Sequence, residues 1–233
     1  MRVPPGFRVF PAGPRRRLVA PPDLGPQLLA AGLARPETLV APRPDGPGTG
    51  RGPRGLVDLP GGGRVLVKQY LRGGVLARFN RDRYAGVGRF LRELAVGARL
   101  HRLGLPVGEV RAVLLAGRAP LLRAWGMARY VPGAPDLARW FTGELPGGEA
   151  ARLWASVLAL VERFHEAGLS HPDLNLGNLL ARRSGDSFEL WLVDLDRARL
   201  LNGPVPAARR ATELGRLARS FRKVVGREPP PVP

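Results

Sequence analysis

The sequence predicts an α+β fold with two lobes, a small β-rich lobe followed by a mainly helical lobe. Between residues 56 and 130, short apolar runs alternate with glycine turns, which is typical of strands and hairpins. Beyond residue 136, apolar residues recur at helical spacing over longer segments. The stretch 131–135, Val-Pro-Gly-Ala-Pro, interrupts both patterns and is interpreted as a linker between the lobes.

The first 40 residues are Pro-rich and are interpreted as an N-terminal extension, with one short helix expected at Pro26–Leu33. A Gly- and Pro-rich loop covers residues 41–55. The glycines at 61–63 then predict a hairpin turn between two strands. Strands of the small lobe are expected at 56–59, 64–70, 110–115 and 121–130, with a helix at about 88–103.

The helical lobe is predicted to contain one long amphipathic helix, Gly148–Ala167, which Gly168 ends. Its apolar stripe consists of Leu153, Val157, Leu160, Val161 and Phe164. Further helices are expected at 136–141 and 207–225, and short strands at 179–181 and 188–193. The predicted lobes therefore span residues 41–130 and 131–227, and the tail 228–233 is expected to be disordered.

Composition narrows the possible functions. The 233-residue chain is 44% hydrophobic, enough for a sizeable core. Cysteine is absent, which excludes disulfides and thiolate metal sites, and three histidines make a multi-His zinc site unexpected. No apolar run approaches the length of a membrane span, and the basic cluster at 15–17 has no apolar segment behind it. We therefore expect a cytoplasmic protein.

The net charge is +18, with an isoelectric point near 11.7. Such an excess favours an anionic partner, which could be a nucleic acid, a membrane surface or a phosphorylated substrate. Of the 37 basic residues, however, all except Lys68 and Lys223 are arginines. This bias, beside abundant Ala, Gly, Pro and Leu, is also typical of a GC-rich genome. Both explanations stay open for the charge.

The most informative segment is His171-Pro-Asp-Leu-Asn-Leu-Gly-Asn178, with Asp194 sixteen residues later at the end of an apolar run. A carboxylate, an amide five residues on and a second carboxylate beyond a hairpin form the loop pattern of phosphotransferases. In that chemistry Asp173 takes the proton of the attacking hydroxyl, and Asn178 and Asp194 hold magnesium against the phosphates of ATP. A plain turn of Pro, Asp, Asn and Gly is the alternative, but it does not account for Asp194. The sequence thus predicts a kinase with a bilobal protein-kinase-like fold.

Two further residues lie in these segments. His171 is expected to support the loop by hydrogen bonding to backbone groups rather than to react. Asp196 is expected to pair with Arg197 or Arg199, and a second metal ligand is the alternative.

Lys68 and Glu93 are the second candidate group. Lys68 ends the apolar run Val65-Leu-Val, where an unpaired ammonium would be costly to bury, and Glu93 lies on the following predicted helix. Kinases pair a strand lysine with a helix glutamate, so that the lysine contacts the α- and β-phosphates of ATP. The alternatives are a surface lysine on an edge strand and a solvated glutamate.

Gly50, Gly52 and Gly55 match the pattern G-x-G-x-x-G-x-V, in which backbone N–H groups approach phosphates. In a chain with 31 glycines the match has low specificity, and Pro53 removes one N–H donor. The linker 131–135 is expected to act as a hinge, with adenine bound by backbone near Arg129–Val131.

Taken together, these motifs resemble those of the lipopolysaccharide core kinases. The features of this branch are Asp-Leu-Asn in the loop, Asp194-Leu-Asp-Arg197 in place of Asp-Phe-Gly, and Lys68-Gln-Tyr-Leu-Arg-Gly-Gly74. The resemblance covers about residues 48–222. It implies an enzyme that uses ATP and Mg²⁺ to phosphorylate a hydroxyl of 3-deoxy-D-manno-octulosonic acid (Kdo) on the lipid A precursor. It also implies peripheral attachment to the cytoplasmic face of the inner membrane.

An arginine-rich segment fits this implied substrate, because Kdo carries a carboxylate and lipid A carries phosphates. Its arginines are interleaved with Phe79 and Tyr84, which could dip into a membrane interface. The candidate acceptor- and lipid-binding residues are Arg72, Arg78, Arg81, Arg83 and Arg197.

Several alternatives stay open. The acceptor could be heptose, another small molecule or a protein, although the absence of an Ala-Pro-Glu segment weakens the protein-kinase reading. An antibiotic phosphotransferase is disfavoured because cationic antibiotics suit acidic pockets. The non-enzymatic alternatives are a pseudokinase and a basic nucleic-acid-binding domain; the joint presence of Lys68, Asp173, Asn178 and Asp194 argues against the first.

Overall fold

The computed structural model describes residues 1–40, 53–71, 82–118, 121–143, 145 and 148–231. The chain divides into two compact units, which we call unit 1 (residues 1–99 and 108–130) and unit 2 (residues 100–107 and 131–233). Unit 1 is built on an antiparallel sheet, and unit 2 is mainly helical. The predicted α+β class, with strands before helices, is therefore confirmed. The border at Tyr130 and Val131 coincides with the start of the predicted linker.

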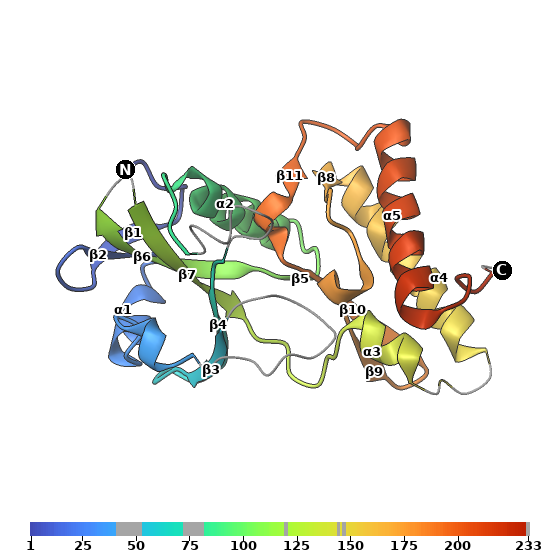
Figure 1. The fold of residues 1–233 in the computed structure, drawn as a ribbon, viewed down its shortest axis with the longest axis horizontal. Helices are drawn as coiled ribbons and strands as arrows, with labels where there is room; N and C mark the ends of the chain where they lie inside the picture. The colour runs from blue at the N-terminus through green and yellow to red at the C-terminus, as the bar shows by residue number, and fades with distance from the viewer. Residues whose placement is uncertain (41–52, 72–81, 119–120, 144, 146–147, 232–233) are drawn as a thin grey trace. The chain divides into compact units, whose positions relative to one another are not determined.

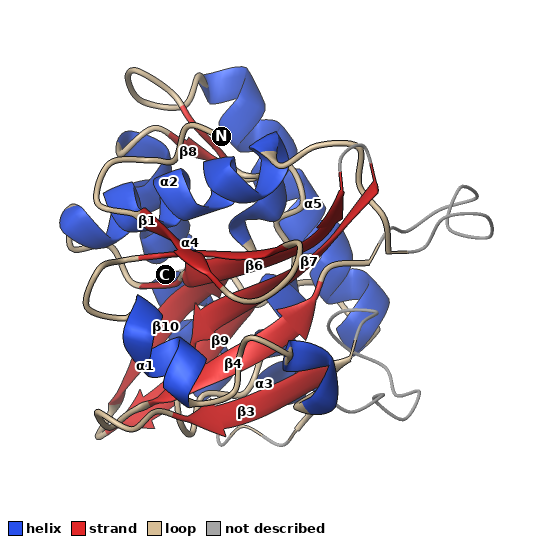
Figure 2. Ribbon diagram, turned by 90° about the vertical axis from the view of Figure 1, so that its left-hand side faces the viewer, coloured by secondary structure: helices blue, strands red, loops and turns tan. Residues whose placement is uncertain are grey.

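The sheet of unit 1 has six strands in the order β1-β2-β6-β7-β4-β3, all antiparallel to their neighbours (Figures 1 and 2). The strands are β1 (Arg8–Pro11), β2 (Arg16–Ala20), β3 (Arg54–Asp58), β4 (Arg64–Gln69), β6 (Val110–Arg118) and β7 (Leu121–Arg129). The helices of this unit are α1 (Gly25–Ala30), the short 3₁₀ helix η1 (Pro36–Thr38) and most of α2 (Gly88–Arg102).

Each face of this sheet packs against a hydrophobic core. Strand residues alternate between the two faces, so Val65 and Val67 of β4 contact the core on the α1 side. Tyr70, which follows β4, belongs to the core on the α2 side, together with Phe90 and Leu94 of α2. Figure 1 shows α1 and α2 on opposite sides of the sheet. The strand that carries Lys68 is therefore held between two hydrophobic cores.

The N-terminal residues differ from the sequence prediction. We predicted a Pro-rich extension at 1–40, but β1 and β2 are members of the sheet, and β2 pairs with β6. Leu18, Val19 and Ala20 are fully buried. The short apolar run was obscured because it follows three consecutive arginines, of which Arg16 bonds the carboxylate of Glu37 within the same unit.

Unit 2 combines helices with two small sheets, in the strand orders β5-β10-β9 and β11-β8. Its helices are α3 (Leu137–Thr142), α4 (Glu149–Glu166) and α5 (Ala207–Val225), with 3₁₀ turns η3 (Leu176–Asn178) and η4 (Leu195–Arg197). The strands are β5 (Val107–Gly108), β8 (Leu169–Ser170), β9 (Leu179–Ser184), β10 (Ser187–Val193) and β11 (Arg199–Leu200). All the longer elements were predicted; the two-residue strands were not.

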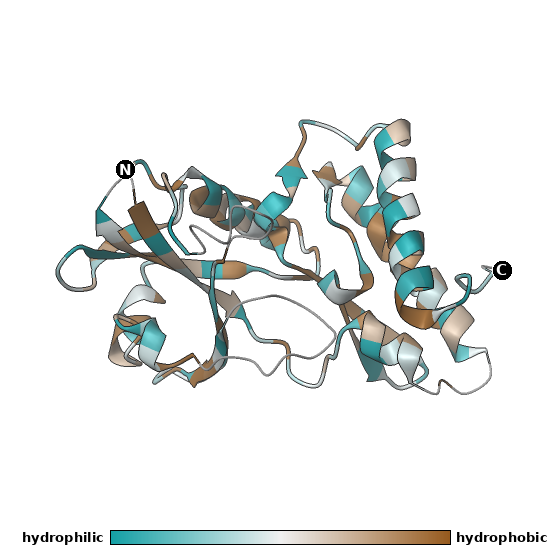
Figure 3. Ribbon diagram, viewed as in Figure 1, coloured by the Kyte–Doolittle hydropathy of each residue, from teal (hydrophilic) through white to brown (hydrophobic). Residues whose placement is uncertain are grey.

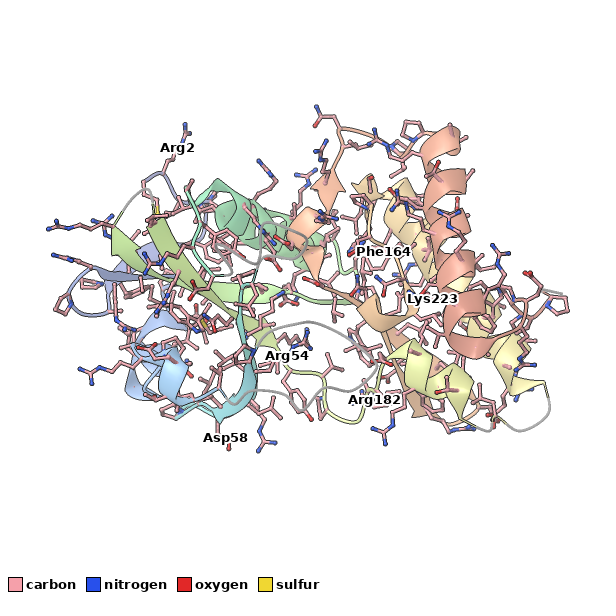
Figure 4. The ribbon with its side chains drawn as sticks, viewed as in Figure 1. Arg2, Arg54, Asp58, Phe164, Arg182 and Lys223 are labelled. Atoms are coloured by element: carbon pink, nitrogen blue, oxygen red, sulfur yellow. The ribbon has the colours of Figure 1, made fainter. Side chains whose placement is uncertain are left out.

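The core of unit 2 forms around α4. All five residues of its predicted apolar stripe are buried, including Phe164, which Figure 4 labels. Near them, the rings of Phe141 and Phe221 lie 4.8 Å apart, and those of Trp154 and Phe221 lie 5.2 Å apart. Since Phe221 is on α5, this aromatic cluster fixes α5 against α3 and α4. The segment 171–178, which follows β8 and ends with η3, therefore lies beside a packed core.

Candidate active site

The first group of predicted site residues lies in unit 1. Lys68, near the end of β4, forms an ion pair with Glu93 of α2, with 3.2 Å between Lys68 Nζ and Glu93 Oε1. The Glu93 side chain is 0% exposed and that of Lys68 is 16% exposed. A carboxylate buried to this degree needs donors. The predicted pairing is therefore present, and neither residue is an ordinary solvated surface group.

The predicted phosphate loop is only partly described. Gly50 and Gly52 lie outside the described residues. Gly55 lies within β3, paired with Val67 of β4, rather than in the loop before it. A Cβ at Gly55 would lie 2.0 Å from the carbonyl oxygen of Leu39, so the close approach of that backbone explains why glycine is required there. The role of these glycines toward phosphates stays a prediction.

The second group lies in unit 2, in the segment 171–178 that follows β8 and ends with η3. Leu174 and Leu176 are buried. Asp173, which directly precedes Leu174, is exposed. The backbone N–H of Leu174 donates to the carbonyl of His171, and that of Leu176 donates to Ser220 Oγ on α5. The two leucines thus fix the loop to the core and leave the Asp173 carboxylate at the surface.

The two amides of the loop have different roles. Asn175 Nδ2 donates to the backbone oxygen of Asp173, and its Oδ1 accepts from Gly177 N–H, so both of its amide atoms are used within the loop. Asn178 Nδ2 also donates to the Asp173 oxygen, at 2.9 Å. Within the described part of the chain, that bond fixes the Asn178 amide and leaves its Oδ1 available as an acceptor or ligand. The geometry therefore favours Asn178 over Asn175 as a metal ligand.

Asp194 follows β10 directly and has left-handed backbone angles, φ 62° and ψ 62°. Such angles are unusual for a residue other than glycine, and aspartate tolerates them better than most residues. His171 Nε2 lies 3.1 Å from the Asp194 backbone oxygen, so this nitrogen carries the proton and donates to it. The expected hydrogen bond of His171 to a backbone group is therefore present. The same bond joins the Asp173 segment to the Asp194 segment.

A buried glutamate that the sequence did not single out supports this loop. Glu213 of α5 is 2% exposed and accepts from Ser170 Oγ, the His171 backbone N–H and His165 Nε2, at distances of 2.6 to 3.0 Å. Burial alone would raise the pKa of Glu213. The hydrogen bonds from His165, Ser170 and His171 outweigh that effect and hold its pKa below the usual value. Glu213 is therefore an ionised group that orients the start of the loop.

Sequence reasoning overlooked Glu213 and assigned no role to Tyr70, and a signal existed for each. Glu213, Leu217 and Phe221 are spaced four residues apart, which places the glutamate on the buried stripe of α5. Tyr70 comes two residues after Lys68, so both side chains point to the same face of the strand. Its hydroxyl donates to Glu93 Oε2.

The other candidate site residues are the arginines proposed to bind the acceptor or lipid, and Asp196. Arg72, Arg78 and Arg81 lie outside the described residues. Arg83 and Arg197 are exposed. The ion pair predicted for Asp196 and the adenine contact near the linker stay predictions. Among the residues that the structure describes, no three His, Cys, Asp or Glu side chains are grouped as metal ligands, and no helix is long and apolar enough to cross a membrane.

Comparison with known proteins gives consistent results. The family model described as Lipopolysaccharide kinase (Kdo/WaaP) family matches residues 55–228. The chain is 39% identical to the 3-deoxy-D-manno-octulosonic acid kinase of Xanthomonas oryzae pv. oryzae over 182 residues, which cover 76% of this chain and 69% of that protein. The identity to the kinase of the same name from Xylella fastidiosa is 34%, with the same coverage.

Solved structures share the fold. WaaP in complex with acyl carrier protein matches with a TM-score of 0.58 at 20% identity, over 89% of this chain and 82% of that one. The Rio2 kinase from Chaetomium thermophilum matches with a TM-score of 0.54 at 18% identity, over 90% of this chain and 64% of that one. At these identities the likeness concerns the fold alone. The protein-kinase-like fold predicted from the sequence is thereby confirmed.

Proposed function

The chain belongs to the lipopolysaccharide kinase (Kdo/WaaP) family, a group of phosphotransferases with an alcohol group as acceptor, and we propose that it phosphorylates a hydroxyl of Kdo on the lipid A precursor. Membership of this kinase family implies that ATP supplies the phosphate. The observation that carries the choice of acceptor is the 39% identity to a Kdo kinase over 182 residues. The loop geometry of unit 2 supports the same chemistry.

In this proposal Asp173 is the residue that handles the acceptor. Its backbone oxygen accepts from both Asn175 and Asn178, which holds the residue in place while its carboxylate remains exposed. A positioned carboxylate can accept the proton of a hydroxyl as the hydroxyl attacks phosphorus. Fixing the backbone in advance avoids reorganisation during the reaction.

Lys68 of unit 1 is proposed to orient ATP. The Lys68 ammonium is held by Glu93, but the lysine side chain is still 16% exposed. The ammonium can therefore reach an oxygen of the α- or β-phosphate. Because the glutamate is buried and the lysine is not, the lysine is the member of the pair that meets the nucleotide.

The oxygen ligands Asn178 Oδ1 and the Asp194 carboxylate fit Mg²⁺, which prefers oxygen and is usually held by one or two protein groups besides phosphates. The hydrogen bond from Asn178 Nδ2 to the Asp173 oxygen leaves Asn178 Oδ1 available as a ligand. The bond from His171 fixes the backbone of Asp194. When bound, the ion would neutralise charge on the phosphates of ATP.

Attachment to the cytoplasmic face of the inner membrane is part of the proposal, and α5 offers a surface for it. Four of its exposed cations lie on one side of the helix, at Arg209, Arg216, Arg219 and Lys223. Arg209, Arg216 and Lys223 are spaced seven residues apart and therefore line up along the axis. Lys223 is labelled in Figure 4. Figure 3 shows hydrophilic residues, in teal, along the length of α5. We call these four residues the α5 stripe.

Reversing two charges of the α5 stripe is expected to weaken binding to anionic phosphatidylglycerol vesicles at least about tenfold, since each cation near such a surface contributes about 1 kcal/mol. The variant is Arg216→Glu with Lys223→Glu, measured by co-sedimentation at low and high salt. Arg8→Glu with Arg17→Glu is the control, because it changes net charge equally on exposed arginines of unit 1. Equal binding by the two double variants would contradict the assignment of this surface.

The acceptor is tested by phosphate transfer from γ-labelled ATP with Mg²⁺. We expect label to enter a Kdo-bearing lipid A precursor and not the same lipid without Kdo. Heptose-bearing core and a protein mixture are offered in parallel. Label in either of these but not in the Kdo-bearing lipid would overturn the proposed acceptor while leaving the kinase family assignment intact.

A further inference from the structure

Each carboxylate oxygen of Glu93 has its own donor from β4 or the residue that follows it. Lys68 Nζ lies 3.2 Å from Oε1, and Tyr70 Oη lies 2.6 Å from Oε2. The Tyr70 side chain is also buried, at 5% exposure, so its bond to Glu93 forms away from water. A short bond from a hydroxyl to an ionised carboxylate is among the stronger hydrogen bonds in proteins. Lys68 and Tyr70 are therefore two donors that hold Glu93.

The surroundings of Tyr70 place its hydroxyl accurately. Its ring packs against Phe90 with 4.7 Å between centroids, and the Lys68 ammonium lies 5.2 Å from its ring centroid. Gly126 of β7 is directly opposite Lys68 in the register of the sheet. A Cβ at Gly126 would lie 2.9 Å from Tyr70 Oη. The glycine thus leaves the space that the tyrosine hydroxyl occupies.

The second donor matters because Lys68 is proposed to contact the phosphates of ATP as well as Glu93. A carboxylate that is 1% exposed loses stabilisation when the Lys68 ammonium is drawn toward another anion. With Tyr70 in place, Glu93 keeps a hydrogen bond while the lysine reaches outward. The tyrosine also ties α2 to β4 through Glu93 without involving the lysine. The position of the glutamate is then set before any nucleotide arrives.

We propose that Tyr70 is a positioning residue of the nucleotide site, which acts through Glu93 to hold the Lys68 ammonium where it meets the phosphates. The proposal rests on the proposed function in one respect, the contact between Lys68 and ATP. It assigns to Tyr70 a role beyond core packing, because the hydroxyl and not the ring performs it.

The substitution Tyr70→Phe removes the hydroxyl and keeps the ring. We expect the dissociation constant for a non-hydrolysable ATP analogue, measured by calorimetry, to rise about tenfold. The loss of one hydrogen bond to a charged group has an effect of about this size. The thermal midpoint of unfolding is recorded alongside. Tyr84→Phe is the matched control, since Tyr84 belongs to the same buried cluster and its ring also packs against Phe90, at 5.0 Å. Nucleotide affinity of that control is expected to equal that of the wild type.

A double-substitution cycle separates positioning from packing. If Tyr70 acts through Lys68, Tyr70→Phe has no further effect on nucleotide affinity in a Lys68→Met background. Gly126→Ala provides a second route, because the added methyl group displaces the Tyr70 hydroxyl and is expected to weaken nucleotide binding in the same way. Wild-type affinity in Tyr70→Phe, or equal losses with and without Lys68, would overturn the proposal. Neither measurement involves the acceptor, so the result is independent of whether Kdo is the substrate.

Discussion

Replacing Asp173 with asparagine is expected to lower kcat by about 10²- to 10⁴-fold, the range that general-base catalysis contributes. The substitution removes the group that takes the acceptor proton and preserves its size. The backbone oxygen of residue 173, which accepts from Asn175 and Asn178, is unchanged, so the loop keeps its conformation. Steady-state kinetics with the lipid acceptor, together with nucleotide affinity, give the measurement. Affinity for ATP is expected to stay within about twofold, well below the effect of one hydrogen bond.

A matched control exists in the same unit. Asp186 lies in the turn between β9 and β10 and is exposed like Asp173. Asp186→Asn is expected to behave as the wild type, because surface substitutions away from special features have small effects. If Asp173→Asn retained most of its turnover, the carboxylate would not be the base, and the phosphotransferase reading of the loop would need another residue.

Replacing Glu213 with leucine is expected to lower the free energy of unfolding by about 3–5 kcal/mol and to reduce kcat as well. The substitution leaves donors of Ser170, His171 and His165 buried without their acceptor. The backbone N–H of His171, whose ring bonds the Asp194 backbone oxygen, then loses its acceptor. Urea unfolding gives the stability, and the transfer assay gives kcat.

The control for this substitution is Glu162→Leu. Glu162 is likewise a carboxylate that accepts from another segment, in its case from Arg210, but its side chain is 56% exposed. An exposed ion pair contributes little, so the loss is expected to be within about 1 kcal/mol. Similar losses for the two variants would mean that burial of Glu213 does not give it a special role.

The pH dependence of stability provides a second readout for Glu213. Hydrogen bonds hold its pKa in the folded protein below the usual value. A lowered pKa in the folded state stabilises the protein above the pKa of the unfolded chain, and this contribution disappears as the pH falls through the folded pKa. The wild type is therefore expected to lose stability over that acidic range more steeply than Glu213→Leu. Parallel curves would contradict the ionised state of Glu213.

The sequence predicted those candidate site residues whose type and spacing follow a chemical pattern. Asp173, Asn178 and Asp194 could be predicted because their residue types and spacing form a motif within a short stretch of chain. Such a motif can be recognised in the sequence without knowledge of the fold. The pairing of Lys68 with Glu93 was predictable for a similar reason, since a lysine in an apolar strand requires a carboxylate. Glu213 was overlooked because one glutamate on an arginine-rich helix resembles a solvated residue.

Among the secondary-structure elements, long helices were the easiest to predict. The apolar stripe of α4 repeats over several turns, and α5 has a similarly long pattern. Strands β1 and β2 were missed because four or five residues with prolines and arginines carry almost no periodic signal. Their place in the sheet depends on pairing with β6, a partner far along the chain, and no local pattern contains that information.

The pairing of β2 with β6 has a consequence for biosynthesis. Arg16 of β2 faces Ala116 of β6, so the N-terminal hairpin leaves the ribosome long before the strand that completes its edge. Until that partner is made, the apolar residues Leu18, Val19 and Ala20 sit beside an unpaired strand edge, which is prone to wrong associations. Contacts so distant in sequence also slow folding. The nascent chain is therefore expected to be most open to wrong associations in the interval between the synthesis of β2 and that of β6.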